Sequence, residues 1–565
     1  MTKPSPVLAH LLALAAIAAP TAAQDPRAPK ALDMWLSQYL AGKLDLDKER
    51  INKSSPGVRF GFVSEERAAS IGHVDELESI CRAVAELANA DAMASLLQVA
   101  AVGFRGVGKD GVEMRPQVVR TVGETWVDRI DAHAGLQVLI EAAENEKAQK
   151  GASLAKRVAA VRALGRRKDE IFRPQIEAAL RSEEPETRLA GAEACADSKL
   201  RTTLPVLVDV LSGEPDELVL IAGFGAMLDI VRQHRDATPE DALRRCADTA
   251  VLALGRTTWR ADMAAVDLLE VVRSAQSVAP LIEVLGRFDD SVDRGRDDLR
   301  SGRLQERAWE VLVSLTAARF PAEAPEQWKS WWEGAKDEFQ VAAVKNDPAP
   351  GEGRTTTGDF FGIPIRGSRV LFVVDASGSM AEEWRGDSGA GGTTAQKGEQ
   401  KIDVARRELL KAVDKLTADC TFNVVIFGNG AKPWQRDMVA ANEKNKKAFQ
   451  RLVEDLRADG GTNLWQGLRD GLKLESLVYG SRYGATYDQL FVLSDGLPTL
   501  GDIQDPKEIL LLIRETNRYS RLRIDTVYIA GDPQMEKRAA EIVGMSGSDF
   551  MKKLAEQNGG ISIGY

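Results

Sequence analysis

Apolar residues recur every three or four positions through most of residues 24–345, and Pro and Gly interrupt the pattern at intervals. This spacing is typical of amphipathic α-helices. Two segments within it, 157–180 and 188–211, align with each other, and their prolines Pro174 and Pro205 lie 31 positions apart. A helix pair that repeats at such an interval cannot bury its apolar face alone and stacks on its neighbours. The pattern therefore predicts an all-α solenoid, with an irregular helical bundle as the alternative.

The pattern changes after Arg369, where short apolar runs alternate with amphipathic segments. The runs predict strands at 370–375, 422–427, 490–493, 524–530 and 561–564, and the segments predict helices at 402–416, 442–456, 464–474, 506–519 and 549–557. Strands and helices in alternation form a mostly parallel sheet between helical layers. We therefore expect an α/β doubly wound, Rossmann-like domain over residues 365–565.

The helical pattern is similar to HEAT repeats, most clearly over residues 150–340, although its period is shorter than the roughly 40 residues typical of that family. The resemblance implies a superhelical stack of helix pairs. Residues 346–364 then lose the periodicity and are rich in Pro, Gly and Thr. Such a composition is typical of a linker. The chain is thus predicted to be multidomain, with a solenoid before the linker and an α/β domain after it.

The N-terminus has the pattern of a secretory signal peptide over residues 1–23. Lys3 precedes an apolar core at 7–19, and Pro20 begins a run of small residues that ends at Ala23, where we expect cleavage. The apolar core is shorter than the roughly 20 residues that a membrane-spanning helix needs. We therefore expect an exported protein without a transmembrane segment in the mature chain, in the periplasm, outside the cell or on its surface.

Composition excludes some partners and sites. The chain has 565 residues, 44% of them hydrophobic and 28% charged, which is ordinary for a soluble multidomain protein. Its formal net charge of -10 argues against a nucleic-acid partner, because phosphate binding needs a basic surface. The four cysteines, Cys81, Cys195, Cys246 and Cys420, are widely separated and contain no C-x-x-C pair. They do not predict a zinc site, and we expect buried free thiols.

Candidate ligands follow the strand predicted at 370–375. Asp375, Ser377 and Ser379 are spaced two apart, so a nearly extended chain that leaves the sheet projects all three side chains to one side. Ligands bind at the carboxyl ends of parallel strands. Two further loops end strands or begin helices with suitable chemistry, and they contain Thr462 and Asp495. The three loops predict a cluster of hard oxygen atoms at one edge of the sheet.

In order and setting, Asp375-x-Ser377-x-Ser379, Thr462 and Asp495 resemble the metal-ion-dependent adhesion site of von Willebrand factor A domains. The resemblance covers roughly residues 365–565. It implies that the two serines and the threonine bind a divalent metal directly, while the aspartates act mainly through water. Mg²⁺ is the expected ion, with Ca²⁺ or Mn²⁺ as alternatives. The resemblance also implies an open coordination position that binds an Asp or Glu side chain of a partner protein.

Two other sequence patterns compete with this interpretation. Residues 386–389 read Gly-Asp-Ser-Gly, similar to the nucleophile segment of chymotrypsin-like proteases. A serine protease also needs a histidine base, and outside the signal His73, His133 and His234 all lie in the helical region. The acidic run at 289–295 has the composition of a calcium loop, but its glycine comes one position late. We therefore interpret the first pattern as a loop and the second as a solvated turn.

The sequence thus predicts an exported, non-enzymatic protein-binding module for adhesion or assembly, in which a metal coordinates a partner carboxylate. An alternative is a regulatory or scaffold subunit of an enzyme complex whose catalytic activity lies in another protein. A further alternative is that the solenoid does the binding and the metal site is vestigial.

Overall fold

The computed structural model describes residues 27–41, 65–102, 116–287, 301–342, 358–384, 398–473, 487–530 and 533–564. The predicted signal peptide, the protease-like segment and the acidic run at 289–295 lie outside these residues. So does most of the predicted linker.

The N-terminal region is helical, as predicted. Its helices are α2 (Ala28–Leu40), α5 (Glu65–Ala85), α6 (Ala90–Ala100), α7 (Pro116–Val127), α8 (His133–Ala143), α9 (Gly151–Arg166), α10 (Arg173–Leu180), α11 (Pro185–Ser198), α12 (Leu204–Gly213), α13 (Glu217–His234), α14 (Glu240–Ala253), α15 (Trp259–Val272), α16 (Val278–Gly286), α17 (Gly302–Thr316) and α18 (Pro325–Ala335). None of the helices in the described residues is both long enough and apolar enough to span a membrane.

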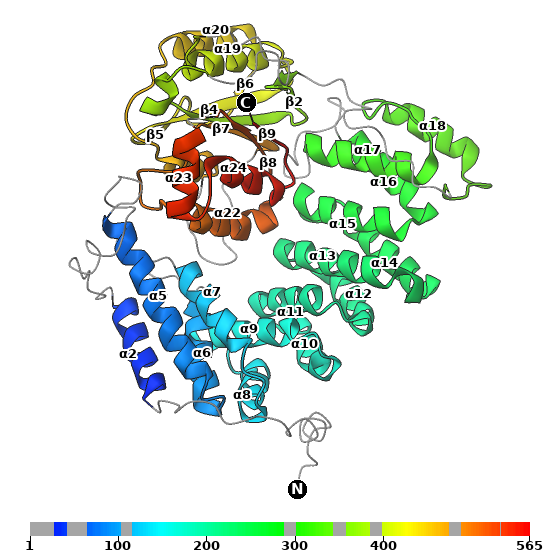
Figure 1. Ribbon diagram of the computed structural model, residues 1–565. Coiled ribbons are helices and arrows are strands. Elements are labelled where there is room, and N and C mark those ends of the chain that lie inside the picture. The colour runs from blue at the N-terminus through cyan, green and yellow to red at the C-terminus, as the bar shows by residue number, and fades with distance from the viewer. Residues whose placement is uncertain are drawn as a thin grey trace.

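The helices stack in two layers. In one layer α9, α11, α13, α15 and α17 each pack against the next, and in the other α10 packs on α12 and α12 on α14. The repeated prolines Pro174 and Pro205 lie in the first turns of α10 and α12, where a missing backbone N–H costs nothing. Gly165 lets α9 approach α11, because a Cβ there would lie 2.4 Å from the Ala194 Cα. The result is the predicted solenoid, which curves around the C-terminal domain (Figure 1).

The C-terminal domain is the predicted α/β sandwich. Its strands are β1 (Asp359–Phe360), β2 (Ile363–Pro364), β3 (Arg369–Asp375), β4 (Thr421–Phe427), β5 (Ala431–Pro433), β6 (Val439–Ala440), β7 (Gln489–Ser494), β8 (Arg523–Tyr528) and β9 (Ser562–Gly564). Its helices are α19 (Lys401–Asp414), α20 (Glu443–Glu454), α21 (Leu464–Gly471), α22 (Pro506–Ser520), α23 (Pro533–Val543) and α24 (Gly547–Glu556).

The main sheet has the order β5-β4-β3-β7-β8-β9. Strands β4, β3, β7, β8 and β9 pair in parallel, and β5 and β6 pair antiparallel with β4. Alternate residues of the sheet enter two apolar cores, one under α19 and α20 and the other under α21, α22 and α24. Strand β3 is therefore central and buried on both faces, which explains its uninterrupted apolar sequence.

Part of the stretch predicted as linker is structured. Strands β1 and β2 form an antiparallel hairpin within residues 358–364. Phe360, Phe361 and Ile363 are buried in the core under α19, and the Phe360 ring packs at 5.1 Å from the Phe372 ring and at 5.5 Å from the Phe491 ring. This aromatic packing orders a segment whose Gly and Pro content is typical of a linker.

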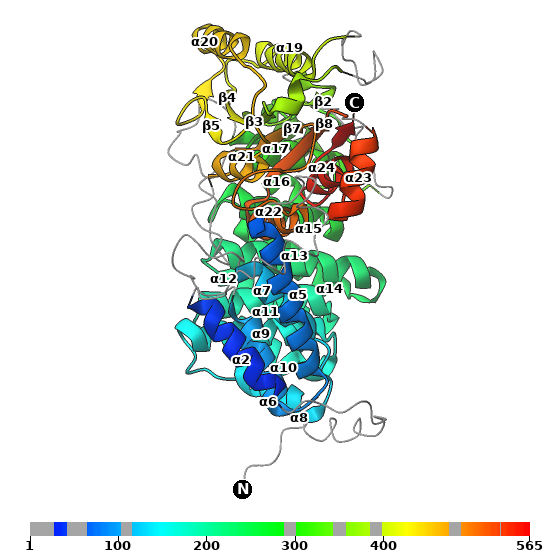
Figure 2. The ribbon, with the colours of Figure 1, turned by 60° about the vertical axis from the view of Figure 1, so that its left-hand side comes forward.

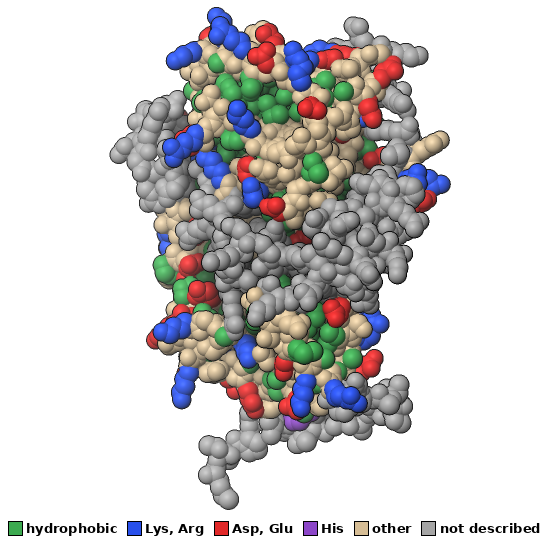
Figure 3. Space-filling model, turned by 90° about the vertical axis from the view of Figure 1, so that its left-hand side faces the viewer, with side chains coloured by type: hydrophobic (Ala, Val, Ile, Leu, Met, Phe, Trp, Pro, Cys, Tyr) green, Lys and Arg blue, Asp and Glu red, His purple; other side chains and the backbone are tan. Residues whose placement is uncertain are grey.

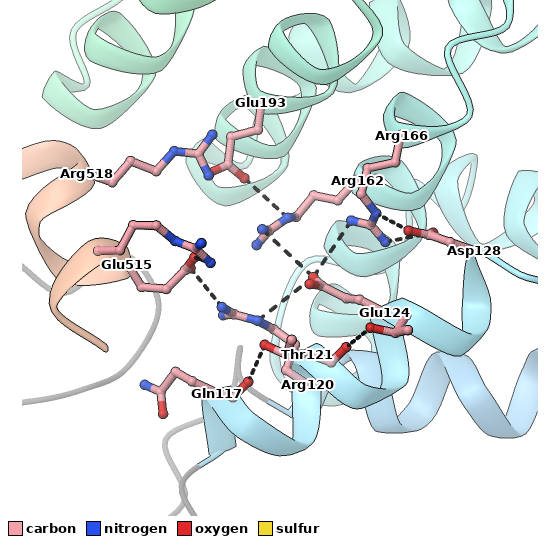
Figure 4. A network of polar contacts seen from close by, with 12 residues as sticks. Gln117, Arg120, Thr121, Glu124, Asp128, Arg162, Arg166, Glu193, Glu515 and Arg518 are labelled. Carbon is pink, nitrogen blue, oxygen red and sulfur yellow. Dashed lines mark hydrogen bonds and ion pairs between the residues drawn. The ribbon is translucent and has the colours of Figure 1, made fainter. Parts of the chain in front are cut away.

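The two parts of the chain meet along α22, which faces α7, α11 and α15 (Figures 1 and 2). Arg120 Nη2 of α7 lies 2.8 Å from Glu515 Oε2 of α22. Glu193 of α11 pairs with Arg518 at 2.9 Å and accepts a hydrogen bond from the Tyr519 hydroxyl. Figure 4 shows how these contacts continue into a network of alternating charges on α7, α9 and α11. Tyr519 is buried in the solenoid core, so the contact is apolar as well as ionic.

All four cysteines are buried and free, as predicted, and burial raises the pKa of Cys81, Cys195 and Cys246 to about 12. On the face that Figure 3 shows, Lys and Arg side chains are interspersed with Asp and Glu side chains over both parts of the chain. That face presents no extended basic surface in its described part.

Candidate metal site

Strand β3 ends in the first candidate ligands. Asp375 is fully buried, and its Oδ1 accepts a hydrogen bond of 2.8 Å from the Ser377 backbone N–H. The Ala376 N–H donates to the Phe427 carbonyl, which ties the first residue of the loop to the end of β4. The loop therefore leaves the sheet in a defined direction, because strand pairing and the Asp375 carboxylate both constrain its backbone.

The structure brings four of the five predicted residues into one hydrogen-bonded chain. The Ser377 and Ser379 Oγ atoms lie 3.1 Å apart, and the Ser379 hydroxyl donates to Asp495 Oδ1 at 2.8 Å. Asp495 follows β7, which pairs directly with β3. Ser494, the last residue of β7, donates its hydroxyl to Asp375 Oδ2 at 2.5 Å. The first and third predicted loops thus converge, as the parallel pairing of their strands requires.

Thr462 joins this group through its loop. The Gly378 N–H donates to the Gly460 carbonyl at 2.8 Å, and the Thr462 N–H donates to the Thr499 hydroxyl at 3.0 Å. Thr462 is buried, and its hydroxyl forms no hydrogen bond with any residue that the structure describes. Thr462 therefore lies between the first loop and the loop after β7, with its hydroxyl left available.

Glycine permits this close approach of the loops. Gly460 has a φ of +77°, and a Cβ there would lie 2.3 Å from the Asn429 Nδ2. A Cβ at Gly378 would lie 3.1 Å from the Gly460 carbonyl oxygen. A side chain at Gly460 would clash with Asn429, and a side chain at Gly378 would press against the loop that carries Thr462. These two glycines are local sequence signals that accompany the ligand residues.

The charge at the site is negative and buried. Burial and the neighbouring Asp495 carboxylate raise the pKa of Asp375 to about 7. No described Lys, Arg or His forms an ion pair with Asp375, so the part of the chain that the structure describes leaves this carboxylate uncompensated. A buried carboxylate without a counter-charge is costly, and a bound cation would reduce that cost.

Lys401 is a component of the site that the sequence analysis missed. This first residue of α19 is 1% exposed, and its Nζ lies 2.7 Å from Asp495 Oδ2 and 2.9 Å from Glu382 Oε2. Burial alone would lower the pKa of Lys401, but the two carboxylates hold it above its ordinary value. In the sequence, Lys401 reads as an exposed charge at a helix start, so only its position after the D-x-S-x-S loop could have suggested a role.

The donor set fits a small hard cation. It consists of hydroxyl and carboxylate oxygens, the ligands that Mg²⁺ prefers. No group of three or more His, Cys, Asp or Glu side chains suited to a metal occurs among the described residues. A metal at this site would therefore depend on Ser377, Ser379 and Thr462 as well as on the two aspartates.

Comparison with known proteins assigns both parts of the chain. Residues 393–562 match the von Willebrand factor type A domain, and the sheet order and helical layers described above agree with that match. The C-terminal domain is a von Willebrand factor type A domain. Residues 136–226 match HEAT repeats. The match to the A domain begins after Ser379 and includes Thr462 and Asp495.

Two curated relatives each match about a quarter to a third of this chain. Inter-alpha-trypsin inhibitor heavy chain H1 of Homo sapiens is 32% identical over 154 residues, which are 26% of this chain and 15% of that protein. Heavy chain H4 of Homo sapiens is 27% identical over 194 residues, which are 33% of this chain and 18% of that protein. The chain thus spans less than a fifth of the length of these relatives.

Among solved structures, the PilB minor pilin from Streptococcus sanguinis is 16% identical and matches over 39% of this chain and 59% of that chain, with a TM-score of 0.23.

Proposed function

We propose that the A domain binds a divalent cation, with Mg²⁺ as the first candidate and Ca²⁺ or Mn²⁺ as alternatives. Ser377, Ser379 and Thr462 would contact the ion, and Asp375 and Asp495 would orient them and balance the charge. The observation that carries this proposal is the uncompensated Asp375 carboxylate beside two hydroxyls and a second carboxylate at the carboxyl ends of β3 and β7. These are the positions that the resemblance to metal-dependent A domains marks for metal binding.

We further infer that the chain is a non-enzymatic binding protein whose partner presents an Asp or Glu side chain. Hydroxyl ligands neutralise little of a cation's charge, so a bound ion keeps its attraction for a carboxylate. Ser379 is partly exposed, whereas Asp375 lies deeper and is fully buried. A partner would therefore approach the site from the side of Ser379. The surrounding loops would decide which partner carboxylate fits.

Export is part of the proposal. The N-terminal pattern supports secretion to the periplasm or the cell surface, where adhesion or assembly would be the biological role. N-terminal sequencing of the mature protein and fractionation of the producing cells test this point. A mature chain that begins near Gln24 in an exported fraction supports it, and an uncleaved cytoplasmic chain contradicts it.

The central experiment is a pull-down from the exported fraction with Mg²⁺ or with chelator. The wild-type chain should capture a partner in Mg²⁺ and release it in chelator, and Asp375→Ala should capture none. Asp403→Ala is a matched control, because Asp403 is an aspartate in the first turn of α19 outside the candidate site. Capture that persists in chelator, or that Asp375→Ala retains, would contradict a metal-bridged contact.

A further inference from the structure

A cavity of about 510 Å³ lies where the A domain meets the solenoid. It is bounded by the C-terminal half of α22, by the end of α24 and by the start of α17, and it opens to solvent. It is separate from the candidate metal site, because its lining contains none of the candidate ligands and comes from elements other than the three ligand loops. A volume of this size is within the range of small-molecule sites.

The lining of this cavity is strongly basic. Arg514, Arg518 and Arg521 come from α22 and its C-cap, Arg303 comes from α17, and Glu515 is the one acidic residue among the lining residues. The cavity thus concentrates guanidinium groups from both parts of the chain, although the protein as a whole is acidic. Guanidinium groups bind phosphate and carboxylate through paired hydrogen bonds.

The available carboxylates neutralise these arginines only in part. Arg518 pairs with the buried Glu193, and Arg521 pairs with Asp267 of α15. The exposed Arg514 lies 3.7 Å from its neighbour Glu515, a weak contact. The Arg521 Nε is buried and has no hydrogen-bond partner among the described residues. One of the residues that line the cavity therefore has an unsatisfied donor.

Arg303 is the least compensated of the group. Its guanidinium donates to the Arg521 backbone carbonyl, and it forms no ion pair with a described carboxylate. Burial, together with the positive charges of Arg521 and Arg523, lowers the pKa of Arg303 to about 10. A protein that holds such a charge beside an open cavity gains stability from an anion that binds there.

We propose that this junction cavity binds a small anion that carries phosphate or carboxylate groups and that contacts Arg303 of the solenoid and Arg514 and Arg521 of the A domain together. Because the contacts come from both parts of the chain, the anion stabilises their docking. The site does not depend on the metal proposed above, so either proposal can fail without the other.

The test is calorimetric titration of the full chain with pyrophosphate and, separately, with citrate. The protein is freed of divalent ions on a chelating resin, so that neither anion can bind through a metal at Ser377 and Ser379. Saturable binding of either anion, with one molecule per chain, is the expected result, and comparison of the two separates a phosphate site from a carboxylate site. The absence of saturable binding for both would overturn the proposal.

Substitutions locate the binding. Arg303→Gln and Arg514→Gln should each weaken the affinity about tenfold, the effect of losing a hydrogen bond to a charged group. Arg181→Gln is the matched control, because the two arginines have similar surroundings. The Arg181 side chain is 55% exposed and lies 3.7 Å from Glu177, and the Arg514 side chain is 59% exposed and lies 3.7 Å from Glu515. Because Arg514 is exposed, its variant should fold even if Arg303→Gln does not. Wild-type affinity in Arg514→Gln, or equal weakening in Arg181→Gln, would overturn the proposal.

Discussion

The two ends of the central sheet carry buried aspartates in opposite electrostatic surroundings, Asp488 at the amino end and Asp375 at the carboxyl end. Asp488 precedes strand β7, and Asp495 follows it beside Asp375 of the neighbouring strand β3. Asp375 and Asp488 are both fully buried. At the amino end of the sheet Asp488 has a counter-charge, and at the carboxyl end Asp375 has none among the described residues.

At the amino end, Asp488 is surrounded by donors. Arg369 Nη2 lies 2.9 Å from Asp488 Oδ1, and the Ser301 and Ser368 hydroxyls donate at 2.9 and 3.0 Å. Burial would raise the pKa of Asp488, but Arg369 and the hydroxyl donors hold it below its ordinary value. Ser301 belongs to the chain just before α17, so this carboxylate also ties the solenoid to the A domain.

At the carboxyl end, Asp375 has hydrogen-bond donors but no cation among the described residues, and its pKa is raised. The one buried ammonium group there, that of Lys401, pairs with Asp495 instead. This difference separates two roles for a buried aspartate. An aspartate that forms an ion pair within the fold is structural, and an aspartate without such a pair is a candidate binding group. Four substitutions test this difference.

Asp488→Ala should have the largest effect. It leaves the Arg369 guanidinium and the Ser301 and Ser368 hydroxyls without their acceptor, and breaking such a buried pair costs about 3 kcal/mol or more. Urea unfolding should show this loss in the free energy of unfolding with and without Mg²⁺. A loss below about 1 kcal/mol would mean that Asp488 is not the structural counterpart described here.

Asp375→Asn should weaken metal binding strongly without weakening the metal-free fold. We expect the Mg²⁺ affinity, measured by calorimetry, to fall about 100-fold, because the site loses a charge that balances the cation. In metal-free buffer the free energy of unfolding should stay equal or rise, because the neutral amide no longer repels Asp495. A stability loss as large as that of Asp488→Ala would show that the two aspartates have the same role.

Lys401→Met should strengthen metal binding. The ammonium group opposes a nearby cation and occupies Asp495 Oδ2, so its removal should tighten the Mg²⁺ affinity about tenfold. Lys411→Met on the same helix is the control, because Lys411 pairs with Glu408 away from the site. Weaker Mg²⁺ binding in Lys401→Met would instead indicate that Lys401 positions Asp495 for the metal.

Ser301→Ala should have the smallest effect. It removes one hydrogen bond to Asp488 and should lower the free energy of unfolding by about 1 kcal/mol. The Mg²⁺ affinity should not change, because Ser301 lies at the opposite end of β7. A change in metal affinity would show that the two ends of the strand are coupled.

The sequence determined the features that depend on neighbours along the chain. The repeat around Pro174 and Pro205 predicted stacked helices, and the apolar run that ends in Asp375 predicted a central strand with ligands at its end. The same local pattern identified Ser377 and Ser379, because they follow Asp375 at a spacing of two residues. Helix α23 was not among the predicted helices, and the hairpin of β1 and β2 was assigned to the linker. The aromatic contacts of Phe360 that order this hairpin join segments far apart in the chain.

Only the tertiary structure decided which charges are compensated. Lys401 and Asp495 are 94 positions apart, and Ser301 and Asp488 are 187 apart, so no local pattern links them. The arginine cavity likewise forms only where α17 and α22 meet. Hydrophobic period and loop chemistry are encoded locally, whereas the counter-charge of a buried carboxylate comes from whichever element packs against it. For this reason the sequence marked Asp375 as a candidate ligand, but only the folded chain shows that Asp488 has a counter-charge while Asp375 has none among the described residues.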